Sequence, residues 1–343
     1  MKILKFSLPF LFLASAPVGL ALGGGWSFLT VALTPAILCG FDWALGFEPN
    51  PAGVPEGPLW RALPGLFILA QVAVTAWTAM VLISPGESLL AVTGATASLG
   101  VSAGVFGVLA AHELVHRREP REQALGLTLL ALVGYMHFRI AHIHGHHVSA
   151  ATVRDPTTAR RGESAYRFIG RAVVGQVREA WRFEVARLRR RGERVFGLSN
   201  RMVRYGAIEL AVAAAFAALG PVAFGFWLGQ AALAIIMLEL FNYIAHYGLL
   251  RRPGEDGALE RLGPRHSWNS SRRMNNWSLF NMGRHSDHHR HPTRAYQALE
   301  AMEGSPELPA GYAGAILLAL APPLWRRVMD PRADAWMAAA GTP

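Results

Sequence analysis

Three short segments of this chain concentrate histidine at spacings of three and four residues. They are His112-Glu-Leu-Val-His116, His142-Ile-His-Gly-His146-His147 and His285-Ser-Asp-His288-His289, with His246 as a further single candidate. Residues three or four apart project from one face of a helix, and neutral imidazole is the commonest protein ligand for zinc, copper, iron and nickel. The pattern therefore predicts a metal centre built from distant parts of the chain.

The first segment, taken alone, has a second interpretation. His112 and His116, with Glu113 between them, match the His-Glu-x-x-His motif of zinc proteases, in which the glutamate is the general base. Such a site needs one more distant ligand and an open position for water. It would leave the other histidine segments without a role. An intramembrane zinc metalloprotease nevertheless stays open as the alternative from another functional class.

Apolar segments lie beside the histidines. Runs close to the length that crosses a bilayer, roughly 17 to 25 residues, occur at 6–22, 26–46, 62–84, 88–111, 206–220 and 221–245. The chain is 52% hydrophobic with a mean hydropathy of +0.25, which exceeds the need of one soluble core. We expect an all-α polytopic membrane protein with about six transmembrane helices. The first run has features of a signal peptide, but we predict a retained helix because the next run follows across Gly23–Gly25.

Charge predicts the side of the membrane on which each histidine segment lies. If Lys2 and Lys5 hold the N-terminus in the cytoplasm, four crossings return the chain there at His112. A fifth crossing at 123–140 would carry the second histidine segment and the arginine-rich stretch 154–204 to the far side. We therefore expect 123–140 to be interfacial or re-entrant. All four histidine sites then face the cytoplasm from a bacterial-type inner membrane.

Two further segments are expected to pack without crossing. Residues 165–190 are predicted to form a basic amphipathic helix, because apolar side chains recur about every four residues at Phe168, Val173, Val177, Trp181 and Val185. The apolar stretch 308–325 is broken by prolines and should lie against the domain or the membrane surface. The net charge of +10 falls mainly in loops. It is therefore interpreted as topological, and no nucleic acid partner is predicted.

The donor set favours two redox-active ions. About nine imidazoles exceed the four ligands of a structural zinc, and magnesium, calcium and manganese prefer oxygen ligands. Iron is therefore the predicted occupant, and paired ferrous ions beside apolar helices suggest oxygen activation on an apolar substrate. The single cysteine, Cys39, offers no iron–sulfur or rubredoxin-like module. Any electron donor must then be a separate protein, and no binding residues for an organic cofactor are predicted.

Residues 60–300 resemble the integral-membrane alkane 1-monooxygenases of the fatty-acid-desaturase-like superfamily. The resemblance lies in the three histidine segments, in Asn242-Tyr-Ile-Ala-His-Tyr-Gly-Leu249, in His266-Ser-Trp-Asn-Ser270, in Asp155–Ser164 and in Pro292–Gln297. It implies a six-helix di-iron enzyme that uses O2 to hydroxylate a hydrocarbon, usually at a terminal methyl. Its electrons would come from rubredoxin or ferredoxin with a reductase. A fatty acid desaturase or a methyl-aromatic hydroxylase on the same irons is the alternative.

The resemblance also implies residue roles. The catalytic carboxylates are predicted to be Glu113 and Asp287, with Glu239 and Asp155 as further acidic candidates. Family members commonly have glutamate where this chain has Ala141 and Ala245. Such carboxylates could orient ligands or balance the charge of the irons. The implied iron ligands are His112, His116, His142, His146, His147, His246, His285, His288 and His289.

Four parts of the chain are expected. Residues 1–111 hold transmembrane helices 1 to 4, and 112–205 hold the first two histidine segments with the interfacial segment and the amphipathic helix. Residues 206–246 hold transmembrane helices 5 and 6. Residues 247–343 hold the third histidine segment, which completes a cytoplasmic histidine-rich di-iron domain, and the C-terminal stretch.

Overall fold

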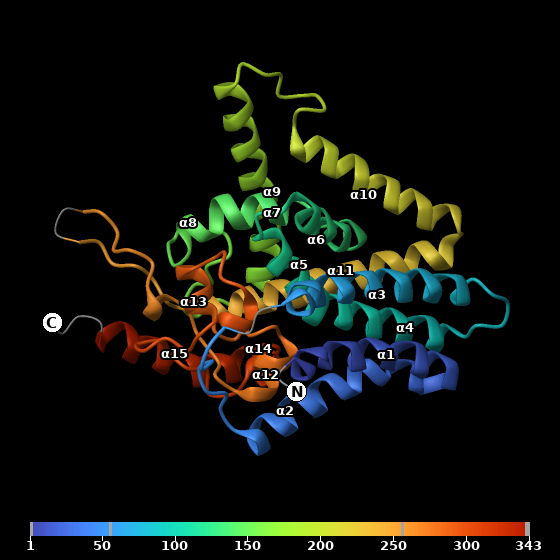
Figure 1. Ribbon diagram of the computed structural model, residues 1–343, viewed down its shortest axis with the longest axis horizontal. Helices are drawn as coiled ribbons and strands as arrows, with labels where there is room; N and C mark the ends of the chain where they lie inside the picture. Colours follow the sequence, from blue (N-terminus) through green and yellow to red (C-terminus); the bar gives the residue numbers. More distant parts are fainter. Residues whose placement is uncertain (1–2, 55–56, 255–256, 340–343) are drawn as a thin grey trace.

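Five long apolar helical segments lie side by side in the computed structural model (Figure 1), which describes residues 3–54, 57–254 and 257–339. Each is long and apolar enough to cross a membrane. Lys2, which the charge argument used, lies outside the described residues. The segments are η1 Leu4–Ser7 with α1 Leu8–Leu22, η2 Gly24–Phe28 with α2 Leu29–Leu45, α3 Pro58–Leu82, α4 Leu89–Ser102 with η3 Ala103–Gly107 and α5 Val108–Val115, and α11 Pro221–His246.

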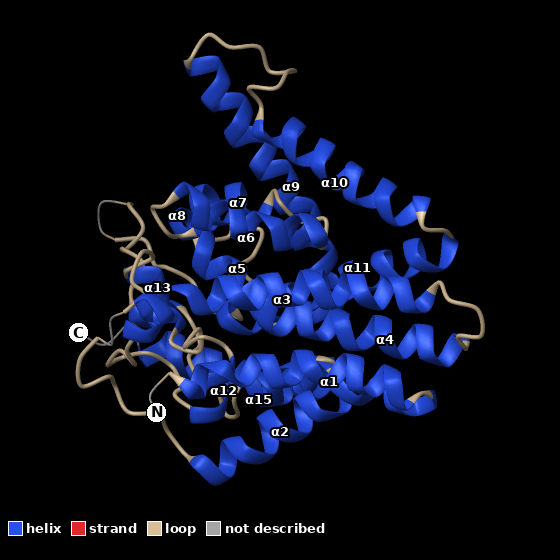
Figure 2. Cartoon of the chain, turned by 45° about the vertical axis from the view of Figure 1, so that its right-hand side comes forward, coloured by secondary structure: helices blue, strands red, loops and turns tan. Residues whose placement is uncertain are grey.

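The predicted sixth crossing falls on α10 Arg201–Ala218, which is shorter and more charged than the other five. Arg201, Arg204 and Glu209 lie in its first half, and Glu209 accepts a hydrogen bond from the amide of Met136. Figure 1 shows α10 running obliquely to the start of α11, at the end of the bundle away from the histidines. The described residues contain helices and loops but no strand (Figure 2), so the all-α membrane fold is confirmed.

The segment at 123–140 turns back before it can cross. It comprises α6 Pro120–Leu132 and the start of α7 Phe138–Ala141. Between them Gly134 adopts a positive φ of 64°, a conformation that glycine tolerates because it lacks a Cβ. The chain then enters η4 His142–His146 and α8 His147–Ser149 next to α5. The second histidine segment therefore returns to the first, as the topology argument requires.

Glycine allows α4 to approach α11 closely. A Cβ at Gly104 would lie 2.8 Å from both the Cα and the carbonyl oxygen of Ala234, and a Cβ at Gly100 would lie 3.1 Å from the carbonyl oxygen of Gln230. Small residues at such crossings allow helix backbones to pack tightly within a membrane. This contact aligns the helix that carries His112 with the helix that carries His246.

Helix α9 Ala165–Arg190 has the predicted bounds, and its N-cap Ser164 accepts a hydrogen bond from the amide of Arg167. Its buried face is more polar than the apolar spacing indicated, and Val177 is exposed. Gln176 on this face donates to Glu239 of α11 at 2.7 Å. Glu184 accepts hydrogen bonds from Arg187 and Arg201 and so closes the turn into α10. Because these partners satisfy the hydrogen-bonding capacity of the carboxylates, Glu184 and Glu239 can be buried at positions where apolar side chains would usually pack.

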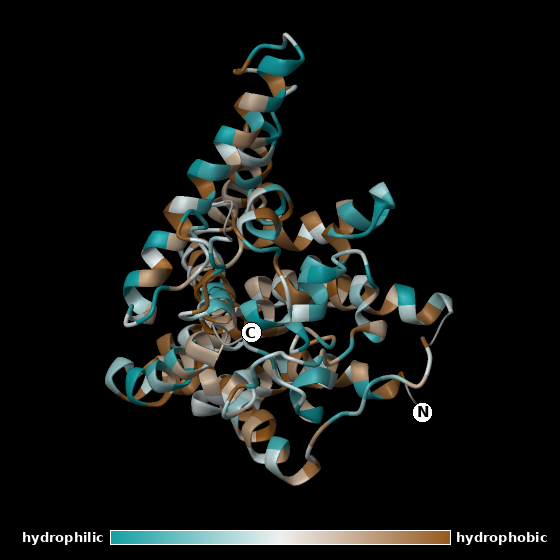
Figure 3. Ribbon diagram, turned by 90° about the vertical axis from the view of Figure 1, so that its left-hand side faces the viewer, coloured by the Kyte–Doolittle hydropathy of each residue, from teal (hydrophilic) through white to brown (hydrophobic). Residues whose placement is uncertain are grey.

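The C-terminal part covers the end of the bundle that carries the histidines (Figures 1 and 3). It comprises η5 Pro264–His266, α12 Arg273–Ser278, α13 His285–Arg290, η6 Tyr296–Ala298, α14 Tyr312–Ala319 and α15 Pro322–Ala339. Helix α14 packs on α2 and α11. The stretch 308–325 thus lies against the body without forming a span of its own, as expected.

Adding one methyl group should destabilise the protein at the tight helix crossing but not at an open position. Gly104→Ala should lower the free energy of unfolding by about 1–3 kcal/mol, because the methyl overlaps backbone atoms of Ala234. Gly225→Ala on α11 has no atom within 4 Å of its Cβ and should be neutral or stabilising by up to about 1 kcal/mol. Thermal unfolding in detergent measures both. Equal midpoints for the two variants would contradict this account of the crossing.

Candidate metal centre

Nine histidines gather into two neighbouring groups at one end of the bundle. Within each group, the candidate ligand atoms all lie within 4.8 Å of one another. The first group contains His112, His116, His142, His147 and His288. The second group contains His146, His246, His285 and His289. These are the nine residues that the sequence named, brought together from segments up to 177 positions apart (289 − 112).

In both groups the imidazoles meet through their Nε2 atoms. In the first, the Nε2 of His142 lies 2.7 Å from that of His112 and 3.0 Å from those of His116 and His147. In the second, the Nε2 atoms of His246, His285 and His289 lie 3.1 to 3.2 Å apart. The Nε2 of His146 is buried without a hydrogen-bond partner.

Hydrogen bonding alone cannot satisfy these nitrogens. A ring nitrogen carries either one proton or one lone pair, so the Nε2 of His142 cannot bond three imidazole nitrogens at once. Protonation is also disfavoured. Burial, together with neighbouring imidazoles, holds the pKa of His142, His147 and His288 well below its ordinary value. Neutral imidazoles whose lone pairs converge fit a metal cation, and the residues present therefore fit the metal that the sequence predicted.

The local helix type determines which histidines share a group. His112 on α5 and His116 at its C-cap are four apart and lie together, as do His285 and His289 on α13, in agreement with α-helical geometry. In the second segment, η4 is a π-helix. His142 shares a group with His147, five residues on, while His146 points into the other group. The wider turn thus divides one short segment between both groups, and π-helical turns are frequent at functional sites.

His146 is oriented by a buried carboxylate. Its Nδ1 donates to Asp155 Oδ2 at 2.9 Å, so its Nε2 keeps the lone pair. Burial alone would raise the pKa of the Asp155 carboxyl. His146 and the hydrogen bonds from the Thr158 hydroxyl and the Thr157 amide outweigh burial and hold this pKa below its usual value. Asp155 therefore lies behind His146 as an ionised partner, an arrangement typical of metal-binding histidines.

A backbone carbonyl orients His246 in the same way. Its Nδ1 lies 3.3 Å from the carbonyl oxygen of His266. The side chain of His266 accepts from the amide of Gly263 and donates to Glu260 at 3.1 Å. His266 thus lies outside both groups and holds the loop that supports His246. The role of this carbonyl had no signal in the sequence, because it depends on how the loop folds.

The two carboxylates predicted to be catalytic lie outside both groups and bind arginines. Glu113 accepts from Arg117 at 3.2 Å, and Arg117 also binds Glu122 and the carbonyl of Arg61. Asp287 accepts from Arg294 at 2.8 Å, from His291 at 2.8 Å and from the amide of Glu300 at 2.9 Å. Both carboxylates hold the ends of helices that carry histidines and do not point at the converging nitrogens.

The remaining polar candidates also lie outside the groups. Glu239 is buried and accepts hydrogen bonds from Tyr135, Gln176 and Asn242. His137 contacts the ring of Tyr135, and burial lowers the pKa of His137 to about 4. His144 is exposed. Ala141 and Ala245, where the resembling family commonly has glutamate, are buried in the core; Ala141 precedes His142 of the first group and Ala245 precedes His246 of the second.

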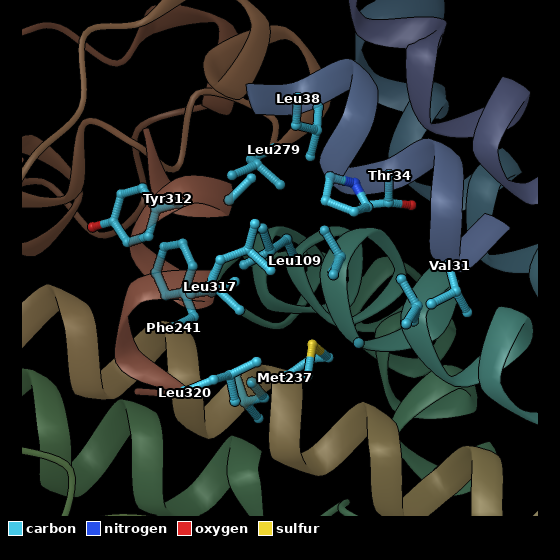
Figure 4. Close-up of a pocket in the computed structure, with 17 residues that line it drawn as sticks. Val31, Thr34, Leu38, Leu109, Met237, Phe241, Leu279, Tyr312, Leu317 and Leu320 are labelled. Carbon is cyan, nitrogen blue, oxygen red and sulfur yellow. The ribbon is translucent and has the colours of Figure 1, made fainter. Parts of the chain in front are cut away.

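An apolar cavity of about 170 Å³ lies between α2, α4, α11 and α14, close to the histidines. Figure 4 shows Val31 toward one end and the rings of Phe241 and Tyr312 toward the other. These rings stack at 4.3 Å, and Phe241 meets the ring of His285 edge-on at 5.5 Å. Leu109, one helical turn before His112, also lines the cavity. The cavity therefore approaches the second group through this aromatic pair.

Comparison with known proteins agrees with this geometry. Residues 87–317 match the fatty acid desaturase family. The chain is 41% identical to alkane 1-monooxygenase 1 of Pseudomonas aeruginosa over 91% of its own length and 84% of that protein. It is 44% identical to the alkane 1-monooxygenase of Ectopseudomonas oleovorans over 70% of its own length and 61% of that protein. The xylene/toluene monooxygenase hydroxylase component XylM of Pseudomonas putida is 31% identical to the chain, over 74% of the chain and 68% of XylM.

A zinc protease site would need His112, His116 and one further ligand, whereas these two histidines share a group with three imidazoles from other segments. The match over most of the chain, the apolar helices and the histidine groups all point to the same class of membrane oxidoreductase. The chain belongs to the alkane 1-monooxygenase family, within the wider fatty acid desaturase family.

Proposed function

We propose that the chain holds two iron ions and uses O2 to hydroxylate an apolar hydrocarbon, such as an alkane at its terminal methyl. The observation that carries the proposal is the convergence of nine imidazole nitrogens into two adjoining groups beside an apolar cavity. Five ligands would hold one ion and four the other. A donor set of imidazoles without carboxylates suits iron better than magnesium, calcium or manganese.

Bound iron would supply the activation of O2 and the transfer of one oxygen atom to a C–H bond. The second oxygen atom leaves as water, which consumes two electrons and two protons. The chain's own residues supply the surroundings for this chemistry. Asp155 and the carbonyl of His266 fix the rings of His146 and His246 so that their Nε2 lone pairs point inward. The buried, apolar walls exclude water from the reacting carbon.

The apolar cavity is proposed to bind the substrate. Its walls carry almost exclusively hydrocarbon side chains, and most of them come from helices of the apolar bundle that is expected to lie in lipid. From Val101 to Leu109 the wall extends about 12 Å at the 1.5 Å rise of a helix. A linear hydrocarbon aligned with this wall would direct one end at Phe241 and Tyr312. These rings then position the terminal carbon beside the second group.

The electrons are proposed to come from rubredoxin or ferredoxin, reduced in turn by a reductase. The chain has a single cysteine, Cys39, on a transmembrane helix, which is insufficient for an iron–sulfur centre. We place the histidine end at the cytoplasmic face of a bacterial-type inner membrane. Arginines cluster next to the helix ends on that side, at 117, 118, 121, 251, 252 and 261, in agreement with the positive-inside rule.

Metal analysis of the purified protein tests the proposal directly. Wild type should contain about two iron ions per chain. His288→Ala and His285→Ala each remove a ligand from a different group, and each should lower iron content toward one and abolish hydroxylation. His144→Ala, at an exposed histidine of the same segment as His142, should retain both. Zinc in place of iron, or iron that is unaffected by both ligand variants, would rule out the proposed centre.

Asp155→Asn should weaken the second group selectively. The neutral amide cannot balance the charge that builds on His146 when it binds a cation, so iron affinity should fall about 10–100-fold at that group. Asp334→Asn, at an exposed residue paired with Arg161, is the matched control. Iron loss to a chelator, followed over time, should become biphasic in the Asp155 variant alone. Monophasic loss at the wild-type rate would contradict the role of Asp155.

Val101→Phe should exclude the longer alkanes as substrates. The larger ring fills the end of the cavity away from the histidines, so hexadecane should be lost as a substrate before octane is. Val18→Phe, on the exposed side of α1, should leave the product ratio unchanged. Gas chromatography of the alcohols formed from a mixture of alkanes measures this. A proportional loss of all chain lengths in the Val101 variant would argue against the cavity as the binding site.

Mass spectrometry of the product separates hydroxylation from the alternatives on the same irons. An alcohol carrying one 18O atom from 18O2 supports hydroxylation. An alkene without the label would identify a desaturase. Preferred oxidation of a methyl group on an aromatic ring would favour a methyl-aromatic hydroxylase, the substrate class in the name of the similar XylM protein.

A further inference from the structure

Electrons from a separate carrier must reach the histidine groups from the protein surface. This inference rests on the proposed function, because it concerns the site at which that carrier docks. Electron tunnelling slows steeply with distance, so a docking surface is useful only where few atoms separate it from the metal ligands. A suitable docking surface would therefore be a hollow whose lining contacts a proposed metal ligand.

One open hollow of about 810 Å³ meets this condition. It lies between the loop after α8 and one side of α9, and Met202 at the start of α10 also lines it. Helix α9 rises out of the bundle at the histidine end (Figures 1 and 3), and hydrophilic and hydrophobic residues alternate along this projection. The hollow is thus accessible at the end of the molecule that carries the metal centre.

The rim of the hollow is strongly basic. Its lining contains five arginines and one carboxylate, and that carboxylate is the buried Asp155. Arg171 is paired with Glu163. The other four form no ion pair within residues 3–54, 57–254 and 257–339, and all four are exposed: Arg154, Arg160, Arg178 and Arg182. Unpaired surface cations raise the local concentration of an acidic partner and steer its approach.

Apolar side chains lie within this basic rim. Val153 is 74% exposed, Val174 is 48% exposed and Val177 is 40% exposed, and Trp181 lies beside them. The apolar stripe of α9 is therefore divided: Phe168 is buried in the core, whereas Val177 and Trp181 line the hollow. An apolar centre with a charged rim is the usual anatomy of a protein interface, and redox encounters are typically small and transient.

The floor of the hollow leads directly to the second histidine group. Asp155 lines the hollow, and its Oδ2 accepts the hydrogen bond from Nδ1 of His146 at 2.9 Å. The Nε2 of the same ring is buried without a hydrogen-bond partner and belongs to that group. One carboxylate and one imidazole therefore separate the surface from the proposed metal.

We propose that the arginine-rimmed hollow over Asp155 is the docking surface for an acidic one-electron carrier protein, and that electrons enter through Asp155 and His146. An anionic lipid is the other partner that arginines could attract. The carrier is favoured because the hollow is concave and because its floor is the hydrogen-bond partner of a proposed metal ligand. Lipid binding would not require such a floor.

The test compares two double variants of the full-length protein in nanodiscs. Arg178→Gln/Arg182→Gln removes two charges from the rim. Arg189→Gln/Arg190→Gln removes the same charge from exposed positions farther along α9, outside the hollow. Hydroxylation is measured against the concentration of a purified acidic rubredoxin at several salt concentrations. A parallel series replaces rubredoxin with dithionite and a small mediator, and rubredoxin binding is measured separately by surface plasmon resonance.

The rim variant should raise the apparent KM for rubredoxin about five- to tenfold at low salt and flatten its salt dependence. Turnover with the small reductant should stay at the wild-type level, and the control variant should change KM by less than about twofold. Equal effects of the two variants, or an unchanged KM in the rim variant, would overturn the proposal. Loss of turnover with the small reductant as well would also overturn it, because the arginines would then act on the site itself.

Two further outcomes keep the inference separate from the proposed function. If no reductant supports hydroxylation, the proposed reaction fails, but the binding assay still reports whether rubredoxin occupies the rim. The heat stability of wild type is also compared between phosphatidylglycerol and phosphatidylcholine nanodiscs. If wild type is more stable in phosphatidylglycerol and the rim variant loses this difference while its rubredoxin binding is unchanged, the hollow binds anionic lipid and the carrier proposal is wrong.

Discussion

The mutual approach of buried imidazole lone pairs is the constraint on which this structure depends. Eight of the nine rings are held with Nε2 atoms 2.7 to 3.2 Å apart, and hydrogen bonds cannot satisfy these nitrogens together. Without a cation, each group would spread apart. The bundle, the covering C-terminal helices and the surrounding ion pairs therefore resist a local repulsion that metal binding converts into attraction.

Charged residues around the centre act mainly by holding backbone elements. Asp287 binds Arg294, His291 and the amide of Glu300, and so fixes α13 from behind. Glu113 and Arg117 connect α5 to α3 and α6. Glu239 joins α11 to α9 through Gln176. Each buried carboxylate has strong donors, which offsets its desolvation. The histidine ends of three separate helices are thereby fixed relative to one another.

The sequence allowed much of this arrangement to be predicted, because spans and ligand spacings are local patterns. The bounds of α9, the return of 123–140 and the nine histidines all followed from such patterns. The division of His142, His146 and His147 between two groups did not, because no local pattern identifies a π-helical turn. The polar buried face of α9 could not be predicted either, because the partner of Gln176 is Glu239, which lies 63 positions away in the sequence. The arginines bound to Glu113 and Asp287 lie only four and seven residues farther along the chain, but their spacing alone does not show that they turn both carboxylates away from the histidines.

The spread of the ligands along the chain has a consequence for biosynthesis. α13 supplies His288 to the first group and both His285 and His289 to the second, and it lies near the C-terminal end. While the ribosome is still making α13, the earlier helices can already enter the membrane. At that stage the first group has four of its five rings and the second has two of its four. Closure of both groups around metal ions would therefore have to wait for the synthesis of α13, and a chain that stopped before α13 would carry a binding site that cannot close.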